Sequence, residues 1–334
     1  MSESTAPDEA VEAAEPSGGE SMLTVVIAFV ANLLIAIAKS IAAAITGSAS
    51  MVAEAAHSWA DAGNEVFLIV AERRSARPSD AKRPLGYGKE AYVWSLFAAV
   101  GLLTAGAGVS IVHGIQELGS DESPDSYVIN YVVLGIAFVL ESVSFFQATR
   151  QTRGKAAAAG LHPLRFINRT SNPTLRAVFL EDAAALTGLI IAALGVWLHQ
   201  VTGDAVWDAI GSIVVGVVLA AVAIFLVERN RSFLVGEAIG GATRDRALTA
   251  ILAHPEVERV TYLHLEFVGP ERLFVVAAVD LTGNADEAAL AVRLQQVEDA
   301  IEGHSMIQAA VLSLSLPDDP PLVPEGLVGG AHPA

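Results

Sequence analysis

Residues 206–227 read VWDAIGSIVVGVVLAAVAIFLV, and no charged residue occurs between Asp208 and Glu228. An α-helix advances roughly 1.5 Å per residue, so about 20 apolar residues are needed to cross the hydrocarbon core of a bilayer. A run of this length and composition is typical of a transmembrane helix. This stretch therefore places at least one part of the chain in a membrane.

Five further apolar runs precede this one, at about 22–46, 50–72, 91–115, 127–149 and 177–200. The chain has a mean hydropathy of +0.49 and only 17% charged residues, whereas soluble domains have about 25%. We therefore expect a polytopic α-helical membrane protein, with a six-helix transmembrane domain at residues 22–227.

Lys and Arg are confined to alternate connections between these runs. They occur after the second, fourth and sixth runs and are missing from the other three connections. The basic residues are Arg73, Arg74, Arg77, Lys82, Arg83, Lys89, Arg150, Arg153, Lys155, Arg165, Arg169, Arg176, Arg229 and Arg231. Because positive charge marks the cytoplasmic side, both termini are expected to be cytoplasmic. The excess of Arg over Lys and the abundant Ala suggest a bacterial source, and hence the plasma membrane.

Composition also limits the possible partners and metal ligands. There are no cysteines, so disulfides and thiolate metal sites are excluded. The net charge of −17 argues against nucleic acid as a partner. Residues 1–21 are acidic and contain no Lys or Arg, so we expect a disordered tail rather than a signal peptide.

Charged residues return in the last third of the chain, which predicts a compact α/β domain at residues 236–317. Apolar residues at helical spacing mark helices at 243–253 and 285–301, and β-rich runs mark strands at 259–267, 273–281 and 307–316. The order αββαβ suggests an open sheet with both helices on one face. Residues 318–334 are expected to form a flexible tail.

The second run contains His57, Asp61 and Asn64 on one helix face. Inserting a charged side chain deep in a membrane costs roughly 2.5–3.5 kcal/mol, so such a residue usually has a functional or structural role. His57 and Asp61 are four residues apart, which places them about 6 Å apart along the axis. An imidazole and a carboxylate at this spacing form half of a tetrahedral zinc site, and Glu181 and Asp182 in the fifth run supply further carboxylates. The alternative is that His57 and Asp61 hydrogen-bond each other and hold two helices together.

Three other intramembrane polar residues favour structural roles. Lys39 and Glu141 have opposite charge, and we expect them to pair with each other. Asn32 is expected to make a helix-packing hydrogen bond.

Four motifs together resemble the cation diffusion facilitator family. They are GSASMVAEAAHSWAD at 47–61, PLGYGKE at 84–90, Asp182 with ALTG at 185–188, and WDAIGS at 207–212. The Asn172-Pro173 pair and the Leu180-Glu181-Asp182 core are most similar to the zinc transporter nine branch. The resemblance implies a secondary transporter rather than an enzyme: a homodimer that exchanges metal for protons by alternating access. It also implies a ferredoxin-like cytoplasmic dimerisation domain and no prosthetic group, the metal being substrate.

The chain departs from the zinc-transporting pattern at Val178, where the family places a His or Asp four residues before Asp182. The matched ligands are therefore His57, Asp61 and Asp182. Glu181 is a candidate fourth ligand, although it lies about 100° round the helix from Asp182; Asn64 or a water molecule is the alternative.

The resemblance also predicts which metal sites are missing. Arg83 and Tyr87 occupy the positions of loop histidines that bind a second metal in some relatives, so that site is expected to be missing. His264 and Glu266 share a strand face, and we expect a solvated surface there rather than a metal site.

Zn²⁺ is the expected substrate, because imidazole suits softer ions. Mn²⁺, Co²⁺, Fe²⁺ and Ni²⁺ remain open as alternatives. The alternative from a different class is an intramembrane zinc-dependent hydrolase in which Glu181 acts as general base, but no HExxH-type sequence supports it.

Overall fold

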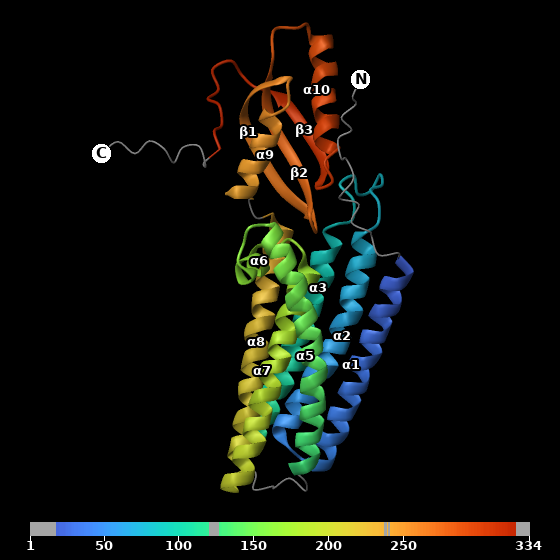
Figure 1. The fold of residues 1–334 in the computed structure, drawn as a ribbon, viewed down its shortest axis with the longest axis vertical. Helices are drawn as coiled ribbons and strands as arrows, with labels where there is room; N and C mark the ends of the chain where they lie inside the picture. The colour runs from blue at the N-terminus through green and yellow to red at the C-terminus, as the bar shows by residue number, and fades with distance from the viewer. Residues whose placement is uncertain (1–17, 120–126, 237–238, 240, 325–334) are drawn as a thin grey trace, which may run out of the picture.

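The computed structural model describes residues 18–119, 127–236, 239 and 241–324. It consists of a bundle of long helices with a small α/β domain at one end (Figure 1). Most of the predicted N-terminal tail and the last ten residues lie outside the described residues. The helical membrane architecture and the C-terminal α/β domain are both confirmed.

The long helices follow the predicted order of the six spans. They are α1 (Gly18–Thr46), α2 (Ala49–Ser75), α3 (Glu90–Gly101) continued into α4 (Val109–Glu117), α5 (Tyr127–Ala158), α7 (Pro173–Thr202) and α8 (Val206–Val235). A π-helical segment, Leu102–Gly108, joins α3 to α4. A short helix, α6 (Pro163–Arg169), lies in the connection between α5 and α7.

Several helix ends differ from the predicted limits. Helix α1 begins at Gly18, inside the stretch predicted as tail. Helix α5 extends to Ala158 rather than 149, and α8 to Val235 rather than 227. The extensions are polar, so hydropathy marks only the apolar part of each helix.

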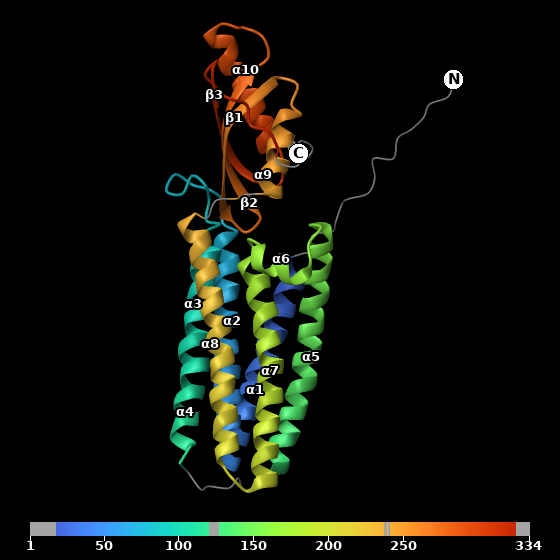
Figure 2. The same cartoon turned by 90° about the vertical axis from the view of Figure 1, so that its left-hand side faces the viewer.

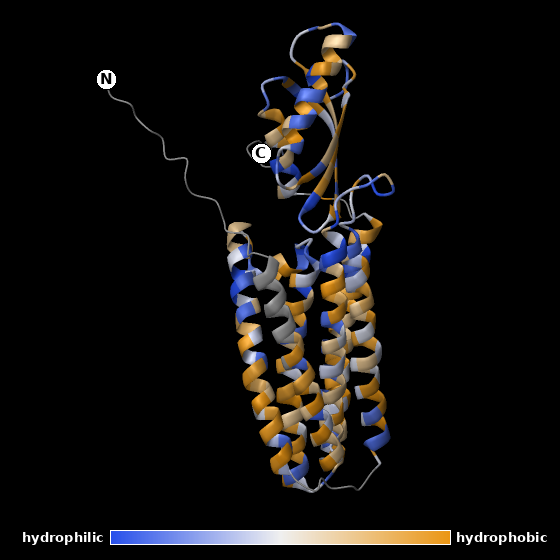
Figure 3. Ribbon diagram, turned by 90° about the vertical axis from the view of Figure 1, so that its right-hand side faces the viewer, coloured by the Kyte–Doolittle hydropathy of each residue, from blue (hydrophilic) through white to orange (hydrophobic). Residues whose placement is uncertain are grey.

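Four helical stretches of the described chain are long and apolar enough to cross a membrane: Glu90–Glu117, Tyr127–Ala158, Pro173–Thr202 and Val206–Val235. Helix α1 contributes a shorter apolar stretch, Asn32–Thr46. Helix α2 is less apolar because it carries the polar residues of the candidate site. Figure 3 shows hydrophobic residues along most of the bundle, and α5 turns Val128, Val132 and Phe146 outward at 68%, 54% and 70% exposure. Such an outward apolar surface is suited to lipid.

The two helices that carry the candidate site begin at well-defined caps. The Ser48 side chain accepts a hydrogen bond from the Met51 backbone N–H at 3.2 Å, which starts α2. The Asn172 side chain accepts from the Leu175 N–H at 3.0 Å, and Pro173 occupies the first turn of α7. These caps satisfy backbone donors that the first helical turn leaves free.

A fully buried ion pair joins α1 to α2. Lys39 Nζ lies 2.9 Å from Glu54 Oε2, and both side chains are 0% exposed. The expectation that Lys39 pairs with Glu141 was wrong, because Glu54 lies on the helix packed directly against α1. A Cβ atom at Gly188 of α7 would lie 2.7 Å from Glu54 Oε1, so only glycine lets α7 pass this close.

The C-terminal domain has the predicted order αββαβ. Its elements are α9 (Ala242–Leu252), β1 (Val257–Gly269), β2 (Arg272–Leu281), α10 (Glu287–Glu302) and β3 (Ile307–Leu314). The sheet order is β1-β2-β3, with β1 antiparallel and β3 parallel to β2. Leu248 of α9 and Val297 of α10 enter one core with alternate strand residues, so both helices cover the same face, as predicted (Figure 2).

The predicted flexible tail is anchored where it leaves the sheet. Arg259 donates to the Asp319 carbonyl at 2.9 Å, and the Leu322 N–H donates to the Val260 carbonyl at 2.7 Å. The first part of the segment predicted as a flexible tail therefore has hydrogen-bond partners on β1 that are remote in sequence.

The β1–β2 hairpin contacts the helical bundle. Lys89 lies 2.6 Å from Glu266, and Lys155 lies 3.1 Å from Glu271. The Glu271 N–H also donates to Ser171 at 2.9 Å. Phe267 packs edge-on against Phe233 of α8, at 5.6 Å between ring centroids. The hairpin thus contacts α8, the C-terminal part of α5 and the residues just before α3 and α7.

We predict that Lys39→Met lowers stability by about 3–5 kcal/mol, because Glu54 would be left as an unpaired buried charge. Thermal unfolding of the purified protein in detergent measures this. The double variant Lys39→Met/Glu54→Leu should recover much of the loss, and Lys82→Met, at an exposed loop position, is the control. A single variant as stable as the parent would contradict the structural role of the pair.

Candidate metal-binding site

Helix α2 presents three ionisable residues at successive turns: His57, Asp61 and Glu65. His57 Nδ1 lies 3.4 Å from Asp61 Oδ1. The imidazole is fully buried, and neither ring nitrogen has a hydrogen-bond partner among the described residues. His57 and Asp61 therefore touch, as the structural alternative expects, but both ring nitrogens are left without the hydrogen bond that buried polar groups normally have.

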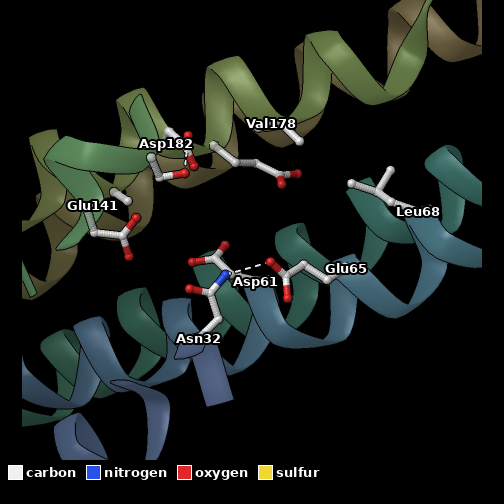
Figure 4. A pocket seen from close by; sticks show the side chains of 10 residues that line it. Asn32, Asp61, Glu65, Leu68, Glu141, Val178 and Asp182 are labelled. Atoms are coloured by element: carbon white, nitrogen blue, oxygen red, sulfur yellow. Dashed lines mark hydrogen bonds between the residues drawn. The ribbon is translucent and has the colours of Figure 1, made fainter. Parts of the chain in front are cut away.

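A cavity of about 70 Å³ lies between α1, α2, α5 and α7. This volume exceeds the roughly 10–15 Å³ that one water molecule requires. Figure 4 shows Asp61 and Glu65 on one wall, with Glu141 and Asp182 on the facing wall. The cavity is lined by Asn32, Asp61, Glu65, Leu68, Glu141, Ser144, Val178, Glu181, Asp182 and Ala185. Five of these residues are carboxylates, so the space has strongly acidic chemistry.

The two acidic residues of α7 face different neighbours. Ser144 of α5 donates to Asp182 Oδ2 at 2.8 Å. Glu181 points toward α2, where Asn64 Nδ2 donates to its Oε2 atom. Glu181 is only 8% exposed, and Glu181 Oε1 and Asn64 Oδ1 are buried without hydrogen-bond partners in the described chain. The partner of Glu181 is thus an asparagine of the facing helix, and both residues keep one oxygen available.

Two cavity residues were missed as candidates in the sequence. Glu65 continues the four-residue spacing of His57 and Asp61, which was the signal that could have found it. Its Oε1 accepts from Asn32 at 2.7 Å, which confirms the helix-packing hydrogen bond expected of Asn32. Glu141 lines the cavity instead of pairing with Lys39.

The structure brings together some of the expected ligands but does not close a coordination shell. Asp61, Glu181 and Asp182 line one cavity, whereas His57 reaches it only through Asp61. No group of three or more His, Asp or Glu side chains in the described part of the chain is arranged closely enough to hold a metal ion. Coordination of one ion by this set would therefore require these side chains to come closer together than they are here.

Val178 lines the cavity without supplying a donor atom. It packs with the apolar cluster that contains Leu68 of α2. The residue that departs from the family pattern thus helps to form an apolar end of the cavity.

The loop between α2 and α3 is held by its own side chains. Tyr87 donates to Asp80 Oδ2 at 2.7 Å, and the Arg83 guanidinium lies 5.0 Å from the Tyr87 ring centroid. The Tyr87 hydroxyl, aided by the backbone N–H groups of Arg83 and Lys82, lowers the pKa of Asp80. Arg83 and Tyr87 are therefore engaged in contacts within the loop.

In the C-terminal domain, His264 is exposed on its strand. Glu266 is not merely solvated as expected, because it forms an ion pair with Lys89. On the sheet face that these two residues share, Glu266 therefore contacts the helical bundle and His264 is exposed.

Comparison with known proteins identifies the family. The sequence model of the cation efflux transmembrane domain matches residues 25–235. Metal tolerance protein C4 from Arabidopsis thaliana is 37% identical over 233 residues, which cover 70% of this chain and 51% of the relative. Proton-coupled zinc antiporter SLC30A9, mitochondrial, from Xenopus laevis is 33% identical over 259 residues, which cover 78% and 46%. The chain spans about half the length of these two curated relatives.

A more distant relative has a similar length. Magnetosome protein MamM from Magnetospirillum gryphiswaldense is 24% identical over 254 residues, which cover 72% of this chain and 71% of that protein. The family match extends over the whole helical bundle and includes all four motifs. It follows that this chain belongs to the cation efflux family, the cation diffusion facilitators, near the zinc transporter nine branch.

Proposed function

We propose that this protein exports divalent metal ions, Zn²⁺ first, in exchange for protons. The observation that carries the proposal is the cavity between α1, α2, α5 and α7, where Asp61 and Asp182 lie on facing walls beside a buried imidazole. Carboxylate and imidazole donors are suited to Zn²⁺. Family membership argues against the hydrolase alternative, because members of this family are transporters.

The proposed ligands are His57, Asp61 and Asp182, with Glu181 or Asn64 as a further donor. Asp61, Asp182 and Glu181 line one cavity and His57 lies 3.4 Å from Asp61, so a rearrangement that brings these groups closer together would place them around one ion. Metal binding requires deprotonated ligands, so protons compete with metal for the same atoms. Opening the site alternately to the two sides of the membrane converts this competition into exchange.

Zinc specificity rests on His57. The relative SLC30A9 is named as a proton-coupled zinc antiporter, which supports both zinc and proton coupling here. The other cavity donors are oxygens, which also suit Mn²⁺. Co²⁺, Fe²⁺ and Ni²⁺ are the remaining alternatives, and flux measured for a panel of metals decides among them.

The proposed orientation places the C-terminal domain and both termini in the cytoplasm of a bacterial cell. Its support is the basic residues near the domain-facing end of the bundle, including Lys89 and Lys155. We propose a homodimer formed through the C-terminal domain. Tyr262 and Val311 are 54% and 49% exposed on the sheet face opposite the helices, where a second copy would cover them.

We predict that Asp182→Asn reduces zinc flux into proteoliposomes at least about tenfold, together with the counterflow of protons. A metal ligand loses its charge, and a factor of ten corresponds to only about 1.4 kcal/mol. The asparagine can still accept from Ser144, so the fold should be kept. Asp204→Asn, in the exposed connection between α7 and α8, is the control. Near-normal flux in Asp182→Asn would refute the proposed site.

We predict that Glu181→Gln weakens zinc affinity by about tenfold without a matching loss of stability. The glutamine oxygen can still accept from Asn64, so the change removes the charge and keeps the hydrogen bond. The expected size follows from measured changes around metal ligands, which are about 10–100-fold. Titration and thermal unfolding of the same sample separate the two effects. A variant that is less stable but binds zinc normally would identify Glu181 as purely structural.

We predict that His264→Ala leaves the number of zinc ions bound per chain unchanged. His264 is exposed, and its neighbour Glu266 is engaged by Lys89. Equilibrium dialysis of the full chain measures the stoichiometry. Loss of a submicromolar zinc ion in this variant would show that the C-terminal domain binds metal.

A further inference from the structure

Two carboxylates in the cavity are held in the same manner. Asn32 of α1 donates to Glu65 Oε1 at 2.7 Å, and Glu65 Oε2 is buried without a hydrogen-bond partner among the described residues. Asn64 of α2 donates to Glu181 Oε2, and Glu181 Oε1 is likewise buried and without a partner there. Each asparagine thus fixes one oxygen and leaves the other available.

Glu65 and Glu181 line the same cavity from facing helices, α2 and α7. Glu65 follows Asp61 by four residues, about 6 Å further along α2 toward Ser75. Glu181 precedes Asp182 and so lies nearer to the start of α7. Both displacements run toward the end of the bundle that contacts the C-terminal domain. Leu68 and Val178 line the cavity beyond them (Figure 4).

The buried negative charges of Glu65 and Glu181 favour the binding of a cation between them. Glu181 is more than nine-tenths buried, it lines the cavity, and its Oε1 atom has no hydrogen-bond partner among the described residues. A buried polar group without a partner costs free energy, and a buried charge costs more. Water could satisfy the free oxygens, but it does not neutralise two ionised carboxylates. A divalent cation does both, in competition with protons.

We propose that Glu65 and Glu181 form a second cation position, on the C-terminal-domain side of His57, Asp61 and Asp182. It holds a partly hydrated divalent metal ion before that ion reaches the inner ligands. Glu181 contributes to both positions. When the ion moves inward, it therefore keeps Glu181 and exchanges Glu65 for a carboxylate of the inner position. This inference rests on the proposed transport function.

The chemistry of this second position differs from that of the inner one. Its donors are carboxylate oxygens and water, which accept Mn²⁺, Co²⁺ and Zn²⁺ with little discrimination. The inner position adds the imidazole of His57. Selection for zinc therefore occurs at the inner position, and the outer position serves to concentrate divalent ions.

The test is Glu65→Gln in the full chain. The glutamine oxygen still accepts from Asn32, so the change removes the charge and keeps the contact between α1 and α2. We expect the KM for zinc, supplied on the side of the C-terminal domain, to rise about tenfold while kcat stays near the parent value. Saturation binding of radioactive zinc should fall from two ions per chain to one.

Two further variants complete the experiment. Glu72→Gln, at an exposed position on the same helix, should leave KM and stoichiometry unchanged. Asn32→Ala keeps the Glu65 charge but removes its hydrogen bond, and it should raise KM less than Glu65→Gln does. If Glu65→Gln fails to fold, the rise in KM of Asn32→Ala decides the question, and an unchanged KM there overturns the proposal.

The outcomes separate this inference from the proposed function. A Glu65→Gln protein with the parent's KM and two bound zinc ions overturns the second position, while normal flux in the parent leaves the transport function intact. A fall in kcat at constant KM also overturns it, because that would place Glu65 in a later step. A parent protein that moves no metal refutes the proposed function and this inference with it.

Discussion

Ionised side chains at membrane depth must be enclosed by protein, and this constraint governs the whole bundle. Lipid offers no hydrogen bonds, so each carboxylate at this depth has to face inward and find a partner. Asp182 is held by Ser144, Glu65 by Asn32 and Glu181 by Asn64. The partners lie on different helices, so the polar groups that line the cavity also contribute to how α1, α2, α5 and α7 pack. If these groups bind the cation as proposed, the same contacts serve both binding and stability.

The Lys39–Glu54 pair is the part of this polar interior that contributes structure rather than binding. Both charges are fully buried at hydrogen-bonding distance, so the pair has no net charge to draw in a cation. It joins α1 to α2, and Gly188 lets α7 approach the same carboxylate. Helix α2 is thus held against α1 next to the turn that carries His57, while Asp61 and Glu65 on its cavity face each keep one oxygen without a hydrogen-bond partner among the described residues.

The C-terminal domain is connected to this arrangement through the β1–β2 hairpin. Ser171 receives a hydrogen bond from the hairpin and lies just before α7, which carries Glu181 and Asp182. Phe267 packs on Phe233, whose ring is stacked on Tyr92 of α3 at 5.1 Å. The C-terminal domain therefore contacts the bundle at the end where α7 begins, on the same side as the cavity residues Glu65 and Glu181 (Figure 2).

The sequence by itself determined the order of the long apolar helices, the αββαβ order and the family, because each depends on periodicity or on motifs that are local in the chain. It also singled out His57, Asp61 and Asp182 as candidate ligands, since charges inside apolar runs are conspicuous, and their role as ligands stays a prediction. It did not determine that Lys39 pairs with Glu54 rather than Glu141, or that Glu65 and Glu141 line the cavity. Helical spacing shows which residues share a face, but the neighbour of that face depends on how each helix is rotated and packed. That choice is made by side-chain packing between segments remote in sequence, and only the tertiary structure decided it.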